Sequence, residues 1–225
     1  MLSRPYHVPS GFQKNVLGRE SMQADTTSMN SDHRKRCRSY NTPGEAHELT
    51  FSCFRRLPLL SKDGSRQWFV EALDEARRRR DFLVWAYVIM PEHVHVIVWP
   101  RQSVYEVRLI RTSLKIPVQR KALAFLRRHA PPFLERLRDA QPNGQVHYRF
   151  WQRGGGYDRN IQEPATLRTM IDYIHNNPVR RGLVDHPTDW PWSSARFYAG
   201  EKDVPWSWFR WWNLSAWVSM LSRPQ

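Results

Sequence analysis

The alternation of apolar and polar residues predicts four strands. Residues 49–54 alternate as a half-buried strand does, and residues 82–90 form a β-branched and aromatic run that is typical of a buried strand. Pro91 ends this run and residues 93–99 form the next one, so we expect an antiparallel hairpin. The fourth strand is expected at residues 146–151.

Helical periodicity marks the segments between these strands. Apolar residues recur at the spacing of one helix face after the first strand: Trp68, Phe69, Ala72, Leu73 and Ala76. Residues 104–138 have a helical and very basic pattern, which Pro117 is expected to kink or split. The glycine run at 154–156 is expected to be flexible. Glu163 and Pro164 open the last helix, because proline is tolerated in a first turn.

The order of these elements is β-α-β-β-α-β-α, which favours an α+β fold. We expect a ferredoxin-like (split βαβ) arrangement, in which an antiparallel sheet has helices mainly on one face. This domain is assigned to residues 45–200. Residues 1–44 are rich in Ser, Asn, Arg and Pro and are interpreted as a disordered basic arm. Residues 201–225 form a Trp-rich C-terminal extension.

Charge narrows the classes of partner. The chain of 225 residues holds 35 Lys and Arg against 21 Asp and Glu, a formal net charge of +14. This excess of positive charge indicates a polyanionic partner, most commonly nucleic acid. A ribosome-associated or merely Arg-rich protein has the same charge. Two cysteines exclude a disulfide framework and a four-cysteine zinc site. With no apolar stretch long enough for a bilayer and no signal-peptide core, we expect a soluble cytoplasmic protein without a membrane partner.

Two histidines stand inside the second strand of the expected hairpin, in the stretch MPEHVHVIV. Side chains alternate faces along a strand, so His93 and His95 project from the same face. Two imidazoles held in this way can bind one divalent metal, which serves phosphate chemistry as a Lewis acid. A histidine pair on a strand is more often structural, so the pair by itself is a weak signal.

A tyrosine and an asparagine in the last helix form the second candidate element. Tyr173 and Asn177 are four residues apart, so on a continuing helix they lie on one face. Tyr173 offers a hydroxyl, and Asn177 offers an amide oxygen for a site suited to Mg²⁺ or Mn²⁺. A residue before proline is biased away from helical geometry, which favours a place just beyond the last turn for Asn177. In the structural alternative, Tyr173 borders the core and Asn177 ends the helix.

Several blocks of the sequence together resemble a known family. The blocks are MPEHVHVIV, YDRNI, DYIHNNPVRRGLV and WPWSSARFY. Their order and spacing resemble those of the tyrosine transposases of insertion sequences, most closely the REP-associated branch, within the HUH nucleases. The resemblance implies that His93 and His95 are metal ligands and that Tyr173 is the nucleophile. It places Asn177 where relatives have a third, amide-bearing ligand, whereas Glu92 departs from the Asn frequently found before the first histidine.

The resemblance implies a metal-dependent endonuclease and strand transferase that acts on single-stranded DNA, with hairpin or palindromic repeat DNA as its substrate. Tyr173 would attack a phosphodiester, form a 5′-phosphotyrosine and release a 3′-hydroxyl. Two alternatives stay open: a phosphoesterase that uses water, and a catalytically idle DNA-binding regulator derived from a transposase. Tyr157 is a lesser candidate for the nucleophile, because it follows the glycine run. The active unit is left open between a monomer and a homodimer.

The basic helical region is interpreted as a contact for the DNA backbone. Its cations could also form an ordinary solvated helix face, and the neighbouring candidate site favours DNA. The candidate residues are Arg108, Arg111, Lys115, Arg120 and Lys121.

Overall fold

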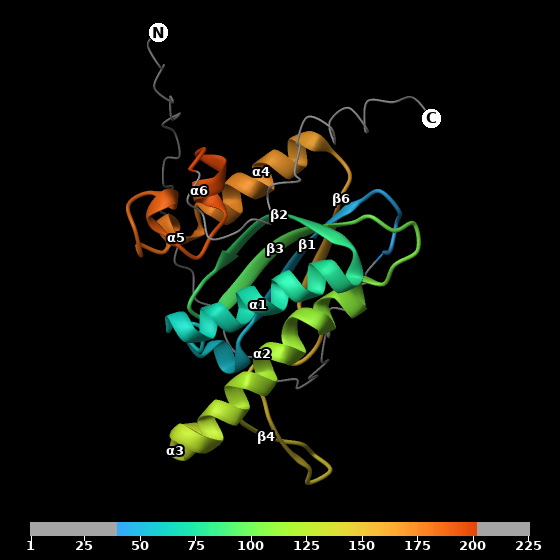
Figure 1. Cartoon of the computed structure of the whole chain (residues 1–225). Coiled ribbons are helices and arrows are strands. Elements are labelled where there is room, and N and C mark those ends of the chain that lie inside the picture. The colour runs from blue at the N-terminus through green and yellow to red at the C-terminus, as the bar shows by residue number, and fades with distance from the viewer. Residues whose placement is uncertain (1–39, 202–225) are drawn as a thin grey trace, which may run out of the picture. The chain divides into compact units, whose positions relative to one another are not determined.

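The computed structural model describes residues 40–201, and its centre is a four-stranded sheet (Figure 1). The strands are β1 (Ala46–Ser52), β2 (Phe82–Ile89), β3 (His93–Pro100) and β6 (Tyr157–Ile161). They lie in the order β2-β3-β1-β6, and each pairs antiparallel with its neighbour. This strand order confirms the predicted ferredoxin-like, split βαβ arrangement.

Helices separate and follow the strands. The long ones are α1 (Asp63–Arg80), α2 (Val107–His129) and α4 (Pro164–His175). The short elements are η1 (Phe54–Arg56), α3 (Pro131–Leu134), η2 (Glu135–Leu137), β4 (Arg138–Ala140), β5 (Val146–Tyr148), α5 (Asn177–Arg180), η3 (Pro187–Asp189) and α6 (Ala195–Tyr198). α2 runs through Pro117 as one helix. Of the predicted kink or split, the split therefore does not occur.

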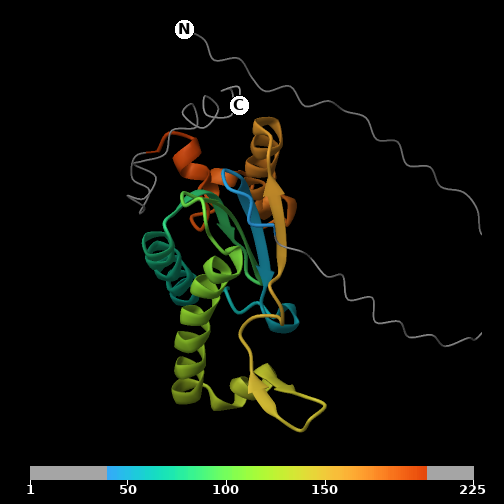
Figure 2. The same cartoon turned by 90° about the vertical axis from the view of Figure 1, so that its right-hand side faces the viewer.

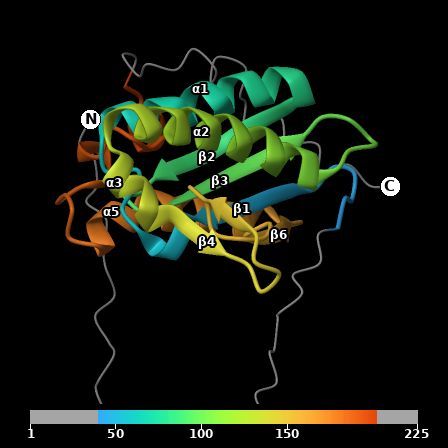
Figure 3. The same cartoon turned by 90° about the horizontal axis from the view of Figure 1, so that it is seen from below.

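The sheet has helices on both faces, and the two faces have separate cores (Figure 2). α1 and α2 lie side by side over one face, which we call the α2 face (Figure 3). Leu49 and Phe51 of β1 point to it and are buried in the larger core. α4 covers the other face, the α4 face, where its Leu167 and Ile171 pack with Ile97 of β3. The two longest helices thus share one face, as predicted, and α4 adds a cover to the face of the histidines.

The fourth strand of the sheet is β6 and not the predicted segment 146–151. β5 pairs with β4 in a separate two-stranded sheet. The apolar residues Phe150 and Trp151 that suggested a strand are buried in the core of the α2 face, where Trp151 packs against Phe51. β6 is an edge strand whose exposed positions are polar, so its hydrophobic signal is weak.

Two predictions concern residues outside the described part of the chain. Residues 1–39 and 202–225 hold most of the predicted basic arm and of the Trp-rich extension, which therefore stay predictions. Between residues 40 and 201, none of the helices has the length and apolarity needed to cross a membrane.

Candidate active site

A row of directly opposed residues crosses the α4 face of the sheet. His95 of β3 is paired with Thr50 of β1, and Thr50 is paired in turn with Tyr157 of β6. Opposed residues of antiparallel strands share a face and have neighbouring side chains. The strand pairing therefore brings together three polar side chains from segments that are distant in the sequence.

The two histidines are neighbours on this face, as the strand periodicity predicts. The ring centroids of His93 and His95 are 4.9 Å apart and the ring planes are nearly perpendicular. His95 Nδ1 is hydrogen-bonded to Thr50 Oγ1 at 2.8 Å and lies 3.4 Å from Glu48 Oε1. His93 Nδ1 lies 3.3 Å from Glu92 Oε1. Because both Nδ1 atoms have partners, the Nε2 atoms are the ones that remain for a metal.

Glu92 links the start of β3 to the segment after α5. Its Oε1 accepts a hydrogen bond from Arg181 Nη1 at 2.7 Å, besides its contact with His93. Burial lowers the pKa of His93 to about 4, with a further contribution from the neighbouring His95. At neutral pH, His93 is therefore an uncharged imidazole, the form that coordinates a metal.

Tyr173 lies next to the histidine pair, at the flank of α4. Its ring centroid is 5.9 Å from that of His95, and the rings meet edge to face. The Arg180 guanidinium lies over the Tyr173 ring, 4.8 Å from its centroid. The side chain keeps 43% of its surface exposed, whereas its neighbour Ile174 is fully buried in the core. The helix thus uses its apolar stripe for packing and leaves Tyr173 exposed beside His95.

A cavity of about 380 Å³ lies on the α4 face beside His95 and Tyr173, and His93 is not among the residues that line it. Its lining combines an acid, a base, hydroxyl groups and a cation, and consists of Glu48, Thr50, His95, Tyr157, Arg159, Met170 and Tyr173. We call it the catalytic cavity, after the function proposed below. It joins the two predicted elements, since Tyr173 and His95 border the same space.

Asn177 is the first residue of α5, two positions beyond the end of α4, and its side chain binds the last turn of α4. Its Nδ2 donates a hydrogen bond to the backbone carbonyl of Tyr173 at 3.0 Å, and the residue is buried. This agrees with the helix-ending alternative and leaves the amide oxygen as the atom that could bind a metal. Asn177 is not among the residues that line the catalytic cavity. Its role as a third ligand stays a prediction.

The donor set fits a divalent metal with few protein ligands. Within residues 40–201, no cluster of three or more His, Cys, Asp and Glu side chains is placed to hold a metal ion. Two imidazoles with oriented rings still fit a metal that takes its other ligands from an amide, water or phosphate. His93 and His95 would hold such an ion.

The sequence pattern did not predict that Tyr157, Glu48 and Arg159 line the cavity. Tyr157 was expected in a flexible loop, yet it is the first residue of β6 and lines the catalytic cavity. Glu48 is buried beside His95, and Arg159 is its partner in the pairing of β1 with β6. YDRNI has no hydrophobic alternation, because its buried middle position is Asp158, so the available signal was its place among the family-like blocks of the sequence.

The five basic residues predicted to contact DNA fall into two groups. Arg108, Arg111 and Lys115 line a second cavity beside α2. Arg120 lies in a different groove between α1 and α2, and Lys121 Nζ forms an ion pair with Glu71 at 2.6 Å. The structure therefore brings only the first three together.

Comparisons with known proteins agree with this architecture. No protein-family model matches the chain. A curated protein of Haemophilus influenzae that is named for the REP-associated tyrosine transposases is 24% identical over 145 residues, which cover 60% of this chain and 76% of that protein. The solved structure of a REP-associated tyrosine transposase bound to a REP hairpin aligns with a TM-score of 0.52 and 25% identity, over 76% of this chain and 89% of that one. The resemblance to the REP-associated tyrosine transposases is thus confirmed, in sequence and in fold.

Proposed function

We propose that this protein is a tyrosine nuclease and strand transferase that acts on single-stranded DNA next to a hairpin. The observation that carries the proposal is the catalytic cavity, where Tyr173 lies beside His95, whose ring contacts that of His93. The solved relative is bound to a REP hairpin, which supports palindromic repeat DNA as the substrate. The net charge of +14 suits a polyanionic substrate.

The reaction is an in-line transesterification at phosphorus. The Tyr173 oxygen attacks, a bond forms between this oxygen and phosphorus, and the bond to the 3′ oxygen of the preceding nucleotide breaks. The phenolic proton leaves, and the released 3′ oxygen ends as a hydroxyl. The Arg180 guanidinium over the Tyr173 ring favours the negative charge that develops there. Because the covalent bond conserves the ester, a second 3′-hydroxyl can reverse the reaction and join a new strand.

A divalent Mg²⁺ or Mn²⁺ between the histidines would supply Lewis acidity at a nonbridging phosphate oxygen. The protein's own contribution is orientation. Thr50 and Glu48 fix the ring of His95, and Glu92 fixes that of His93. Partners of this kind typically change metal affinity or activity by about 10–100-fold when removed.

The test is to incubate the protein with labelled hairpin DNA that carries single-stranded flanks, in Mn²⁺, and to separate the products on a denaturing gel. The DNA panel includes palindromic repeats from the neighbourhood of the gene. We expect a protein-linked band that is absent in Tyr173→Phe and His95→Ala. Tyr157→Phe is the matched control, because it removes a hydroxyl from the same cavity, and it should still form the band.

Two outcomes would contradict the proposal. Cleavage that persists in Tyr173→Phe would mean that water is the nucleophile and that the protein is a phosphoesterase. Tight binding of a cognate hairpin without any covalent product would indicate an idle regulator.

A further inference from the structure

The second cavity, beside α2, has a volume of about 430 Å³ and a basic lining. Its cations come from two distant parts of the chain. Arg108, Arg111 and Lys115 belong to α2, while Arg149 and Arg153 belong to the segment between β5 and β6. Among the described residues that line it, none carries a carboxylate. We call it the basic cavity.

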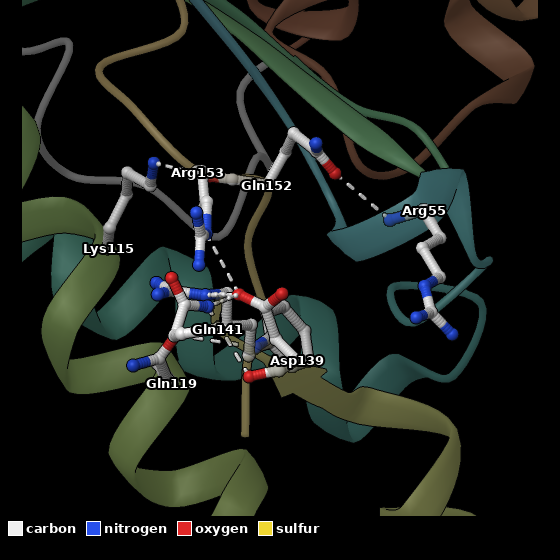
Figure 4. Close-up of polar contacts among 9 residues, drawn as sticks. Arg55, Lys115, Gln119, Asp139, Gln141, Gln152 and Arg153 are labelled. Atoms are coloured by element: carbon white, nitrogen blue, oxygen red, sulfur yellow. Dashed lines mark hydrogen bonds and ion pairs between the residues drawn. The ribbon is translucent and has the colours of Figure 1, made fainter. Parts of the chain in front are cut away.

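Lys115 is held in the basic cavity by backbone carbonyls and not by an acid. Its Nζ donates to the carbonyl of Gly154 at 2.9 Å and lies 3.5 Å from that of Gln152 (Figure 4). Burial, followed by the charges of Arg111 and Arg149, lowers the pKa of the amine to about 8. These surroundings disfavour the charged form of Lys115, so an entering anion would stabilise it.

Arg111 is a second cation with unused hydrogen-bonding capacity. Its side chain is only 12% exposed, and its Nη1 lies 3.5 Å from Asp158 Oδ2. Its Nε is buried without a hydrogen-bond partner. A Cβ at Gly155 would lie 2.9 Å from the Arg111 Cζ, so glycine lets the loop lie against the guanidinium.

The acids near the basic cavity do not neutralise it. Arg149 and Arg153 share the carboxylate of Asp139, which lies below Arg153 in Figure 4. Arg111 has Asp158 as its acidic neighbour, and Arg108 Nη2 lies 3.0 Å from Glu106 Oε2. These three carboxylates face the five cations of the lining, and Lys115 is held by backbone carbonyls. An anion would complete this arrangement, and a phosphate is the form in which nucleic acid presents one.

One loop joins the basic cavity to the catalytic cavity. Gly154 and Gly155 line the first, and Tyr157 lines the second. Gly156 lies between them, where an added Cβ would be 2.2 Å from the Thr50 carbonyl oxygen, so the loop is pressed against β1. Two residues of chain span at most about 7 Å. A DNA strand that passes this edge of the sheet can therefore reach both cavities within a few nucleotides.

We propose that the basic cavity binds a phosphodiester of the substrate DNA, a few nucleotides from the one that Tyr173 attacks. Lys115 and Arg111 are the principal contacts. This inference rests on the proposed function, since it assigns the second cavity to the same strand. It gives the protein a means of setting the distance between an anchored phosphate and the cleaved one.

The test is a scan in which single phosphates of the flanked hairpin are replaced, one at a time, by neutral methylphosphonates. Binding is measured by fluorescence anisotropy at several salt concentrations, without divalent metal. The variant is Lys115→Met, which keeps the aliphatic stem. Lys62→Met is the matched control, because Lys62 is an exposed lysine that precedes α1 and lines neither cavity. Lys115→Arg tests rescue by a different cation.

We expect Lys115→Met to bind roughly tenfold more weakly and to lower the salt slope by about one unit. One methylphosphonate position should weaken binding of the natural protein and of Lys115→Arg, but not of Lys115→Met. Lys62→Met should behave as the natural protein does. If Lys115→Met binds more weakly but every methylphosphonate position still has its effect, the lost affinity comes from altered folding. That result would overturn the proposal.

Two further outcomes separate this inference from the proposed function. If inorganic phosphate fills the cavity and no single backbone position matters, the inference fails even though the covalent product forms. If the Lys115 pattern is present but no covalent product forms with any hairpin, the inference stands and the nuclease proposal fails.

Discussion

The two faces of the same sheet differ in the side chains that cover them: one is an apolar core and the other borders a polar cavity. On the α2 face, Leu49 and Phe51 of β1 are buried among aliphatic and aromatic side chains. On the α4 face, Glu48 and Thr50 of the same strand border the catalytic cavity. Successive residues of one strand thus lie in the core and at the cavity in alternation, because side chains alternate between faces.

The difference shows how polar side chains can be held in place by an apolar core on the opposite face of their strands. The α2 face has a continuous core, which holds β1 and β3 in place. The α4 face also has an apolar core against α4, but the polar side chains of Glu48, Thr50 and His95 border a cavity beside it. The stability of the first face therefore positions His95 and Thr50 on the second. Substitutions on the two faces should separate stability from activity.

The largest effect is expected on the α2 face. Phe51 is 2% exposed and its ring contacts those of Phe69 and Trp151. Phe51→Ala should lower the free energy of unfolding by about 3–5 kcal/mol. Denaturant unfolding measures this change. At temperatures where the variant is folded, it should still form the covalent product. Loss of that product in the folded variant would mean that Phe51 also positions the substrate site, for which Lys115, 5.8 Å from the centroid of its ring, is the nearest candidate.

The adjacent residue on the α4 face should show the opposite pattern. Thr50→Val removes the hydroxyl that is 2.8 Å from His95 Nδ1 and keeps the shape of the side chain. We expect cleavage in Mn²⁺ to fall by about 10–100-fold, with a higher Mn²⁺ concentration needed for half-maximal rate. The unfolding midpoint should change little. Equal cleavage by Thr50→Val and the natural protein would remove Thr50 from the site.

The pH dependence of DNA binding should distinguish the contribution of Lys115 in the basic cavity from that of the other surface cations. Lys115, with a pKa lowered to about 8 by burial and by Arg111 and Arg149, is charged below that pH and neutral above it. DNA affinity should therefore stay constant below about pH 7 and fall by up to about tenfold towards pH 9. The same titration of Lys115→Arg should be flat, because arginine keeps its charge. An equal decline in both proteins would assign the titration to another group.

The smallest effect is expected for the ion pair between β3 and the segment after α5. Arg181→Met breaks the 2.7 Å contact with Glu92, and because Arg181 is half exposed the loss of stability should be about 0.5–1 kcal/mol. Arg196→Met, which breaks a peripheral pair with Glu201, is the matched control. Cleavage should fall a few-fold in Arg181→Met alone. Equal cleavage by both variants would show that this pair does not position the site.

Much of the site could be predicted because it depends on local periodicity. A strand period of two places His93 and His95 on one face, and the apolar stripe of α4 leaves Tyr173 at its flank. The hairpin of β2 and β3 also follows from a short break between two apolar runs. In contrast, β6 was missed because an edge strand with polar exposed positions gives a weak pattern.

The amino-acid sequence by itself determined the fold class, the histidine pair, the tyrosine and the excess of positive charge. Only the tertiary structure decided which of the cations act together and which polar side chains border the cavity. Tyr157 comes beside His95 through pairing of both strands with β1, and Arg153 comes beside Lys115 through a loop closure. Such juxtapositions join residues that are far apart in the chain, and they arise from strand order and packing. Local periodicity carries no information about either.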